Sequence, residues 1–234
     1  MKKTLALLLT LLLGLALLGL AGCGTEPTKP ASETDKIFEQ GWDAYDADDF
    51  DKALELFNKA IELDPAYAEA YYYRARVYAE LEEFMKELAD YDKTIELDPT
   101  HADAYFWRGS FYDEVKEYEL ALADYSKTIE LLPDDAINYI MRALVYKSLE
   151  RYDEAIADYS KSIELKPDNA TAYSGRANIY FNLKRYNEAV ADYSKAIEFR
   201  PDYAAAYKNR GDAYFVLGED ELADADYAKA AELE

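Results

Sequence analysis

The stretch "AYSGRANIYFNLKRYNEAVADYSKAIEFRP" (residues 172–201) decides the fold, because similar segments recur along the chain. It ends at Pro201, and four earlier segments end at prolines spaced 34 residues apart, at Pro65, Pro99, Pro133 and Pro167. Aligned on these prolines, residues 34–234 contain six copies of one pattern. A fixed period of this length is typical of proteins in which one copy cannot bury its apolar face alone and neighbouring copies stack.

Each copy predicts two helices. In the fourth copy, Tyr139, Ala143 and Tyr146 recur at helical spacing. A polar break follows, and residues 152–165 then form a second run with apolar residues on one side. The proline after each second helix ends that helix, because proline lacks the backbone N–H and clashes with the preceding turn.

This period and pattern resemble the tetratricopeptide repeat (TPR). The resemblance implies an all-α fold, a right-handed superhelix (α-solenoid) of six helical hairpins. Small residues stand in one column where two helices must approach closely, at Gly41, Ala75, Gly109, Ala143, Ala177 and Gly211. A second small column contains Ala53, Ala121, Ala155, Ala189 and Ala223, with Glu87 as the exception. The six copies are predicted at residues 34–67, 68–101, 102–135, 136–169, 170–203 and 204–234.

The N-terminus differs in composition from the repeats. Met1, Lys2 and Lys3 form a short basic segment, and residues 4–22 follow without a charge. A basic segment, an apolar run and small residues are together typical of an export signal. A permanent transmembrane helix is the alternative, because the run is about long enough to span a bilayer. Glycines near the end of the run weaken the helix there and favour a cleaved signal.

Leu20, Ala21, Gly22 and Cys23 resemble a bacterial lipobox at all four positions. The resemblance implies that residues 1–22 are a lipoprotein signal peptide and that Cys23 carries a covalent lipid; no other cofactor is expected. Several acyl chains anchor a protein stably where a single chain holds weakly. Because Cys23 is the only cysteine, an intramolecular disulfide is excluded.

Residues 23–33 are small and polar and include two prolines, which predicts a disordered spacer after the lipidated cysteine. The lipoprotein resemblance places the protein on a bacterial membrane. In a Gram-negative cell, Gly24 in place of an aspartate favours the outer membrane, facing the periplasm. In a Gram-positive cell, the protein would lie on the outer face of the cell membrane.

Two charged columns occur together. Copies two to six carry an arginine in the first helix and an aspartate 16 residues later, whereas the first copy has Gln40 and Leu56. We predict structural ion pairs, because the planar guanidinium can hold a carboxylate with two bonds. A ladder of arginines for an anionic ligand is the alternative. The predicted pairs are Arg74–Asp90, Arg108–Asp124, Arg142–Asp158, Arg176–Asp192 and Arg210–Asp226.

In TPR proteins the inward faces of the first helices line a concave groove that contacts ligands. The resemblance places these candidates there: Phe38, Trp42, Tyr45, Tyr72, Arg76, Phe106, Trp107, Ile140, Leu144, Asn178, Asn182 and Lys208. Both tryptophans of the chain are among them, and surplus aromatic residues are a candidate hot spot. Packing is the alternative: Phe38 and Trp42 would close the first hairpin, and Trp107 would pack against the next helix.

Composition narrows the function classes. The formal net charge of −22 argues against nucleic acid and against an anionic membrane surface, so the lipid is the only expected membrane contact. We find no nucleophile–base constellation, phosphate-binding glycine loop or metal-ligand spacing, and therefore predict no enzyme and no metal site. The one histidine, His101, follows Pro99 in a turn and is predicted to be solvent-exposed.

The sequence therefore predicts a non-catalytic TPR scaffold, anchored at the cell envelope, that binds an envelope protein or peptide in its groove. The alternative is a lipoprotein that stacks cell-wall glycan (peptidoglycan) on the aromatic N-terminal part of the groove. The alanine-rich outer face of the last predicted helix (residues 220–234) would also allow a weak homodimer.

Overall fold

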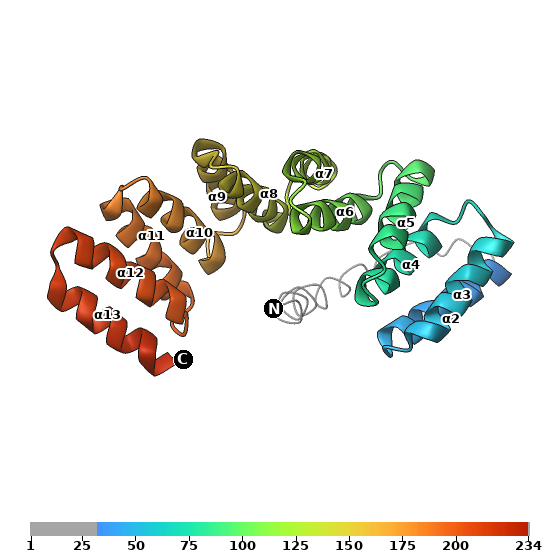
Figure 1. The fold of residues 1–234 in the computed structure, drawn as a ribbon, viewed down its shortest axis with the longest axis horizontal. Coiled ribbons are helices and arrows are strands. Elements are labelled where there is room, and N and C mark those ends of the chain that lie inside the picture. Colours follow the sequence, from blue (N-terminus) through green and yellow to red (C-terminus); the bar gives the residue numbers. More distant parts are fainter. Residues whose placement is uncertain (1–31, 234) are drawn as a thin grey trace, which may run out of the picture. The chain divides into compact units, whose positions relative to one another are not determined.

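The computed structural model describes residues 32–233, and the fold of this part is all-α, with twelve helices in six hairpins (Figure 1). The first helices of the six copies are α2 (Glu33–Asp46), α4 (Ala68–Glu80), α6 (Ala102–Glu114), α8 (Ala136–Ser148), α10 (Ala170–Asn182) and α12 (Ala204–Leu217). The second helices are α3 (Phe50–Leu63), α5 (Phe84–Leu97), α7 (Tyr118–Leu131), α9 (Tyr152–Leu165), α11 (Tyr186–Phe199) and α13 (Asp220–Leu233). The predicted fold class is confirmed for this part of the chain.

The repeated prolines end the second helices, as predicted. Helix α3 ends at Leu63, and Asp64 has extended backbone angles (φ −137°, ψ 94°) immediately before Pro65. Asp98 does the same after α5, with φ −131° and ψ 93°. A proline disfavours helical angles in the residue before it, so the helix stops one residue earlier.

The turn inside each hairpin contains a residue with a left-handed backbone. The six positions are Asp48, Glu82, Lys116, Glu150, Lys184 and Gly218, with φ between 56° and 78°. Glycine is the usual sequence signal for this conformation, because side chains make it unfavourable. Only the last copy carries that signal, which is why the sequence pattern does not reveal these turns.

The two small-residue columns lie where the helices of one hairpin touch. Ala75, Ala143 and Ala177 have no exposed surface, and the same holds for Ala53, Ala121, Ala155 and Ala189 in the second column. A Cβ atom added to Gly41 would lie 2.8 Å from the ring of Phe57 in α3. Glu87, the exception in the second column, is also buried, at 7% exposed.

Each hairpin also packs against the next one along the chain. Helix α3 contacts α4, α5 contacts α6, α7 contacts α8, α9 contacts α10 and α11 contacts α12. Buried residues from adjacent copies share clusters, for example Ile140 of α8 with Ala172 and Ile179 of α10. The core is therefore continuous from copy to copy, as stacked repeats require.

The predicted signal peptide, Cys23 and most of the spacer lie outside the described residues. Of the predicted spacer, only Ser32 and Glu33 are described, and α2 begins at Glu33. Within residues 32–233, no helix is both long enough and apolar enough to cross a membrane.

Candidate functional site

The predicted arginine and aspartate columns meet inside each of copies two to six. Arg142 in α8 donates from Nε and Nη2 to the two oxygens of Asp158 in α9, both at 2.8 Å. The other four pairs repeat this fork, with N–O distances between 2.7 and 2.9 Å. The aspartates are buried, so each arginine neutralises a carboxylate that would otherwise be unpaired in the core.

Each of these arginines also reaches the preceding copy. Nη1 of Arg142 donates to Oγ of Ser126 in α7 at 3.0 Å, and Nη1 of Arg108 donates to Asp92 in α5 at 2.6 Å. The guanidinium of Arg142 lies near the rings of Tyr139 and Tyr146, at 6.0 and 5.8 Å from their centroids. One side chain thus ties three helices together, and each of its three nitrogens already donates a hydrogen bond within the protein.

Three of the predicted groove residues are buried between copies. Tyr72, Phe106 and Ile140 are 6%, 8% and 7% exposed. They occupy one repeat position, and this position faces the first helix of the following copy: Tyr72, for example, clusters with Ala104 in α6. Their assignment to the ligand-contacting surface is therefore wrong, because stacking of the next hairpin covers their side chains.

Of the groove candidates in the first copy, Phe38 and Tyr45 pack against other aromatic rings, whereas Trp42 is exposed. The ring of Phe38 lies 5.8 Å from that of Phe57, and it also makes edge contacts with Tyr67 and Tyr73. Tyr45 packs against Phe50 and Tyr73. Trp42 remains 41% exposed. The packing interpretation thus describes Phe38, whereas Trp42 stays available to a partner.

A second repeat position of the first helices stays open, and we call it the groove row. It comprises Trp42, Arg76, Ser110, Leu144, Asn178 and Asp212. None of these residues is buried, and Leu144 is 39% exposed. Beneath the row lies a column of second-helix aromatic residues, among which Tyr91, Tyr125, Tyr159 and Tyr193 are at most 1% exposed. The side chains of the groove row therefore differ from copy to copy, whereas the buried residues beneath them are aromatic in each case.

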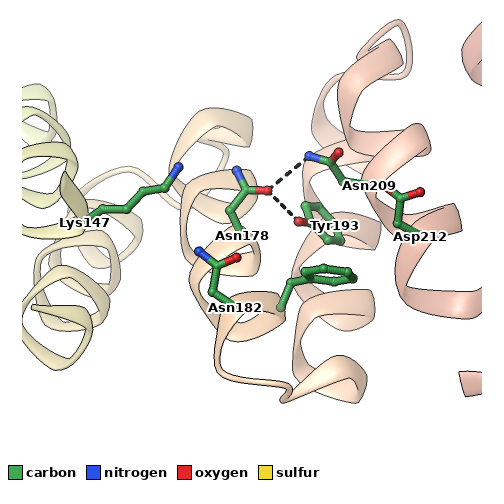
Figure 2. A pocket seen from close by; sticks show the side chains of 7 residues that line it. Lys147, Asn178, Asn182, Tyr193, Asn209 and Asp212 are labelled. Carbon is green, nitrogen blue, oxygen red and sulfur yellow. Dashed lines mark hydrogen bonds between the residues drawn. The ribbon is translucent and has the colours of Figure 1, made fainter. Parts of the chain in front are cut away.

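The groove row opens into a pocket at copies four to six. The pocket has a volume of about 230 Å³ and is lined by Lys147, Asn178, Phe181, Asn182, Tyr193, Asn209 and Asp212. Figure 2 shows Asn178 and Asn182 projecting from α10, with Lys147 of α8 on one side and Asn209 and Asp212 of α12 on the other. Of the predicted groove candidates, the pocket thus brings together Asn178 and Asn182.

Asn178 is held in place by two hydrogen bonds to its side-chain oxygen. The hydroxyl of Tyr193 in α11 donates at 2.6 Å, and Nδ2 of Asn209 in α12 donates at 3.1 Å (Figure 2). Burial raises the pKa of Tyr193, so its hydroxyl keeps its proton and remains a donor. With its oxygen occupied, Asn178 turns its amide nitrogen toward the side of Lys147, where it can donate to a ligand.

The sixth-copy side of the pocket is acidic. Asp212 accepts a hydrogen bond from the hydroxyl of Tyr227 at 2.9 Å and pairs with Lys208 at 3.2 Å. Lys208, also a predicted groove residue, therefore contacts the pocket-lining Asp212 but does not line the pocket itself. Lys147 on the opposite wall gives the pocket a positive end as well.

His101 is not solvent-exposed, contrary to the prediction from its position in a turn. Its side chain is 8% exposed, its ring lies 4.6 Å from that of Tyr72, and its Nδ1 accepts the backbone N–H of Ala104 at the start of α6. Burial acts to lower the pKa of His101, but the Glu69 carboxylate, 3.5 Å from Nε2, raises it above its ordinary value. The sequence interpretation missed this because a histidine N-cap resembles an ordinary turn residue.

Sequence reasoning also left Tyr193 and Asn209 out of the candidate site. Tyr193 follows Asn178 by 15 residues, and Asn209 follows it by 31. The same spacing of 31 joins Arg76 to Trp107, whose ring centroid lies 3.8 Å from the guanidinium. A side chain 31 residues after a groove-row residue is therefore its neighbour in the next copy. The repeat fixes this spacing, so the sequence contained a signal from which Asn209 could have been found.

Comparison with known families and structures agrees with this architecture. Models described as "TPR repeat" match residues 143–184 and 177–218, and models described as "Tetratricopeptide repeat" match residues 38–101 and 90–123. A search of curated proteins found no match.

Several solved structures are similar to the chain. MamA has 28% identity and a TM-score of 0.66, over 74% of this chain and 94% of MamA. YrrB, described as a TPR protein with an unusual peptide-binding site, has 27% identity and a TM-score of 0.66, over 78% and 94%. A tetratricopeptide repeat protein from Parabacteroides merdae has 24% identity and a TM-score of 0.74, over 86% and 80%, which supports the fold alone.

The family matches together span residues 38–123 and 143–218, which is more than half of the chain. They coincide with the hairpins of the structure and with the 34-residue period of the sequence. The chain belongs to the tetratricopeptide repeat family.

Proposed function

We propose that the protein is a non-catalytic scaffold that binds an extended peptide segment of a partner protein along the groove row. The pocket around Asn178 carries this proposal, because its side chains offer hydrogen bonds in a partly enclosed site without a nucleophile–base pair. The similarity to YrrB, which is described as having a peptide-binding site, supports the same class of ligand.

The spacing of Asn178 and Asn182 suits a peptide backbone. The two residues are one helical turn apart, which separates them by about 6 Å along α10. A peptide that lies along the groove row crosses α10, so the two amides can stand on either side of its backbone and bond different backbone groups. Carboxamides both donate and accept hydrogen bonds, so the pair can hold a backbone regardless of the peptide's side chains. Such contacts give affinity, and neighbouring groove-row residues give specificity.

The glycan-binding alternative has less support. It requires aromatic faces that a sugar can cover, and it relied on Trp42, Tyr72, Phe106 and Trp107. Tyr72 and Phe106 are buried, and the guanidinium of Arg76 lies over the ring of Trp107. Trp42 alone keeps an exposed ring, at 41%. One aromatic ring is a small platform compared with the polar pocket at copies four to six.

Substituting Asn178 tests the peptide-binding proposal. Peptides are first selected on the purified full-length chain from a random library of acetylated, amidated decapeptides. We expect Asn178→Ala to weaken their binding about tenfold, because the ligand loses a donor while Tyr193 and Asn209 lose their acceptor. Fluorescence polarisation with labelled peptides measures the affinity.

Asn187→Ala is the matched control, because Asn187 is exposed on α11 and does not line the pocket. It should bind the selected peptides as the wild type does. Failure of the library to yield any binding peptide would contradict the proposal, as would equal affinity of the wild type and Asn178→Ala.

We further propose that this scaffold is a lipoprotein, held at a bacterial membrane through a lipid on Cys23. The basic start, the apolar run and the lipobox pattern of residues 20–23 support this, and residues 23–33 would give the repeats reach from the membrane. In that case the lipid determines where the protein acts, and the groove row determines what it binds. The partner is then a protein or peptide of the cell envelope.

Replacing the anchoring thiol tests the lipid proposal. We expect Cys23→Ser to move the protein from the membrane fraction to the soluble fraction, or to leave it unprocessed, because serine cannot accept the thioether-linked lipid. Membrane fractionation and the mass of the mature N-terminus measure both effects. Membrane retention together with normal removal of residues 1–22 would refute the anchor.

A further inference from the structure

Arg76 differs from the arginines that pair with aspartates. It lies in the groove row on α4, stacked at 3.8 Å over the ring of Trp107 in α6, and its Nη1 donates to the hydroxyl of Tyr72 at 3.4 Å. Among residues 32–233, no carboxylate lies within 4.0 Å of its guanidinium. In a chain with 48 acidic residues against 26 basic ones, a half-buried arginine without a carboxylate is unusual.

Beneath Arg76, the hydroxyl of Tyr91 lacks an acceptor within the described residues. In copies five and six, the second-helix tyrosine donates to the groove-row residue 15 positions before it: Tyr193 to Asn178, and Tyr227 to Asp212. Tyr91 stands in this relation to Arg76, which offers no acceptor. The hydroxyl of Tyr91 is buried and has no hydrogen-bond partner in the described part of the chain.

The surroundings restrict the kind of anion that fits. The ring of Trp107 covers one face of the guanidinium and Nη1 bonds Tyr72, which leaves Nε and Nη2 for a bidentate contact with an equally planar carboxylate. Arg76 brings one positive charge, which a carboxylate neutralises, whereas a doubly charged phosphate would keep one charge without a cation.

We propose that Arg76, stacked on Trp107, forms a subsite that binds one carboxylate of the peptide in the groove. The inference deepens the proposed function and rests on it, because it gives the ligand an acidic group three copies away from Asn178. The pocket holds the backbone, and Arg76 selects peptides with an acid at the matching place. The carboxylate is supplied by an aspartate or glutamate side chain or by the C-terminus of the peptide.

Three peptide pools on the full-length chain test this subsite. All share randomised neutral flanks and an acetylated N-terminus. The first has a central Glu and an amidated C-terminus, the second has Gln in place of Glu, and the third has Gln with a free C-terminal carboxylate. We expect an acid-bearing pool to bind about tenfold more tightly than the neutral second pool, as measured by fluorescence polarisation. The pool that shows the gain identifies the source of the carboxylate.

Arg76→Met should remove this gain and leave the affinity for the neutral pool unchanged. Arg200→Met is the matched control, because Arg200 is another arginine without a carboxylate partner in the described chain, and it bonds Thr171 far from Arg76 in sequence. It should retain the gain. Arg76→Lys keeps the charge but not the planar stack, so it should retain only part of the gain in affinity. This variant replaces Arg76→Met in the test if Arg76→Met does not fold.

The possible failures are distinguishable. Equal binding of all three pools to the wild type, with binding still dependent on Asn178, overturns the subsite and leaves the proposed function standing. An undiminished gain in Arg76→Met also overturns the subsite. Absence of binding by every pool overturns the proposed function and the subsite together.

Discussion

We expect Arg142→Met to lower the free energy of unfolding by about 3 kcal/mol, because it leaves a buried carboxylate unpaired. Arg142 joins α8 to Asp158 in α9 and to Ser126 in α7. Its removal leaves the Asp158 carboxylate, with its side chain 8% exposed, without a cation. Urea denaturation followed by circular dichroism measures the effect.

Arg151→Met is the control for this prediction. Arg151 also lies near Tyr146, but its bond to Glu154 joins two residues of one helix start, and both side chains are more than 40% exposed. We expect a loss of at most about 0.5 kcal/mol, since exposed ion pairs contribute little. The double variant Arg142→Met, Asp158→Leu should regain much of the lost stability, because it removes the unpaired charge. Equal stability of Arg142→Met and the wild type would refute a structural role for the pair.

We expect Gly175→Ala to lower the free energy of unfolding by about 2 kcal/mol, although alanine normally stabilises a helix. Gly175 lies in α10, and a Cβ atom there would be 2.5 Å from the ring of Tyr159 in α9. Tyr159 is 1% exposed, so its ring has no free space to move into. Thermal and urea unfolding of the variant measure the loss.

Gly109→Ala is the control, because an alanine side chain fits at this position. Its added Cβ would lie no closer than 3.2 Å to Asp124, and Ala75, Ala143 and Ala177 occupy the same repeat position in other copies. We therefore expect no loss, and a gain of up to about 1 kcal/mol from helix propensity. If Gly175→Ala were as stable as Gly109→Ala, the close approach of α9 and α10 would not constrain the sequence.

The stability framework and the binding surface use different positions of the same repeat. The arginine–aspartate pairs and the small columns recur in nearly every copy, whereas the groove row changes from Trp42 through Arg76 to Asn178. Because each hairpin contacts mainly its neighbours, groove-row residues can vary without changing the framework. This separation lets one regular fold present chemically distinct subsites along its length.

Much of this architecture was predictable from the sequence because it repeats. The 34-residue period aligned the copies with one another, so paired changes such as Gln40 with Leu56 indicated that Arg and Asp act together. Helix ends followed from the prolines. The groove was less predictable: Tyr72, Phe106 and Ile140 have the helical spacing of the inward face, yet the next hairpin covers them. Spacing within one helix cannot show which of two adjoining faces a neighbouring copy occupies.

The sequence by itself determined the fold class, the number of hairpins and the pairing of the charged columns, since these follow from local periodicity repeated six times. Only the tertiary structure decided which first-helix residues stay open, why Gly175 has no side chain, and that within residues 32–233 Arg76 has no carboxylate partner and the Tyr91 hydroxyl has no acceptor. The physical reason is that these properties depend on contacts between side chains 15 to 31 residues apart, made across helix faces. Their distances arise only when the hairpins stack.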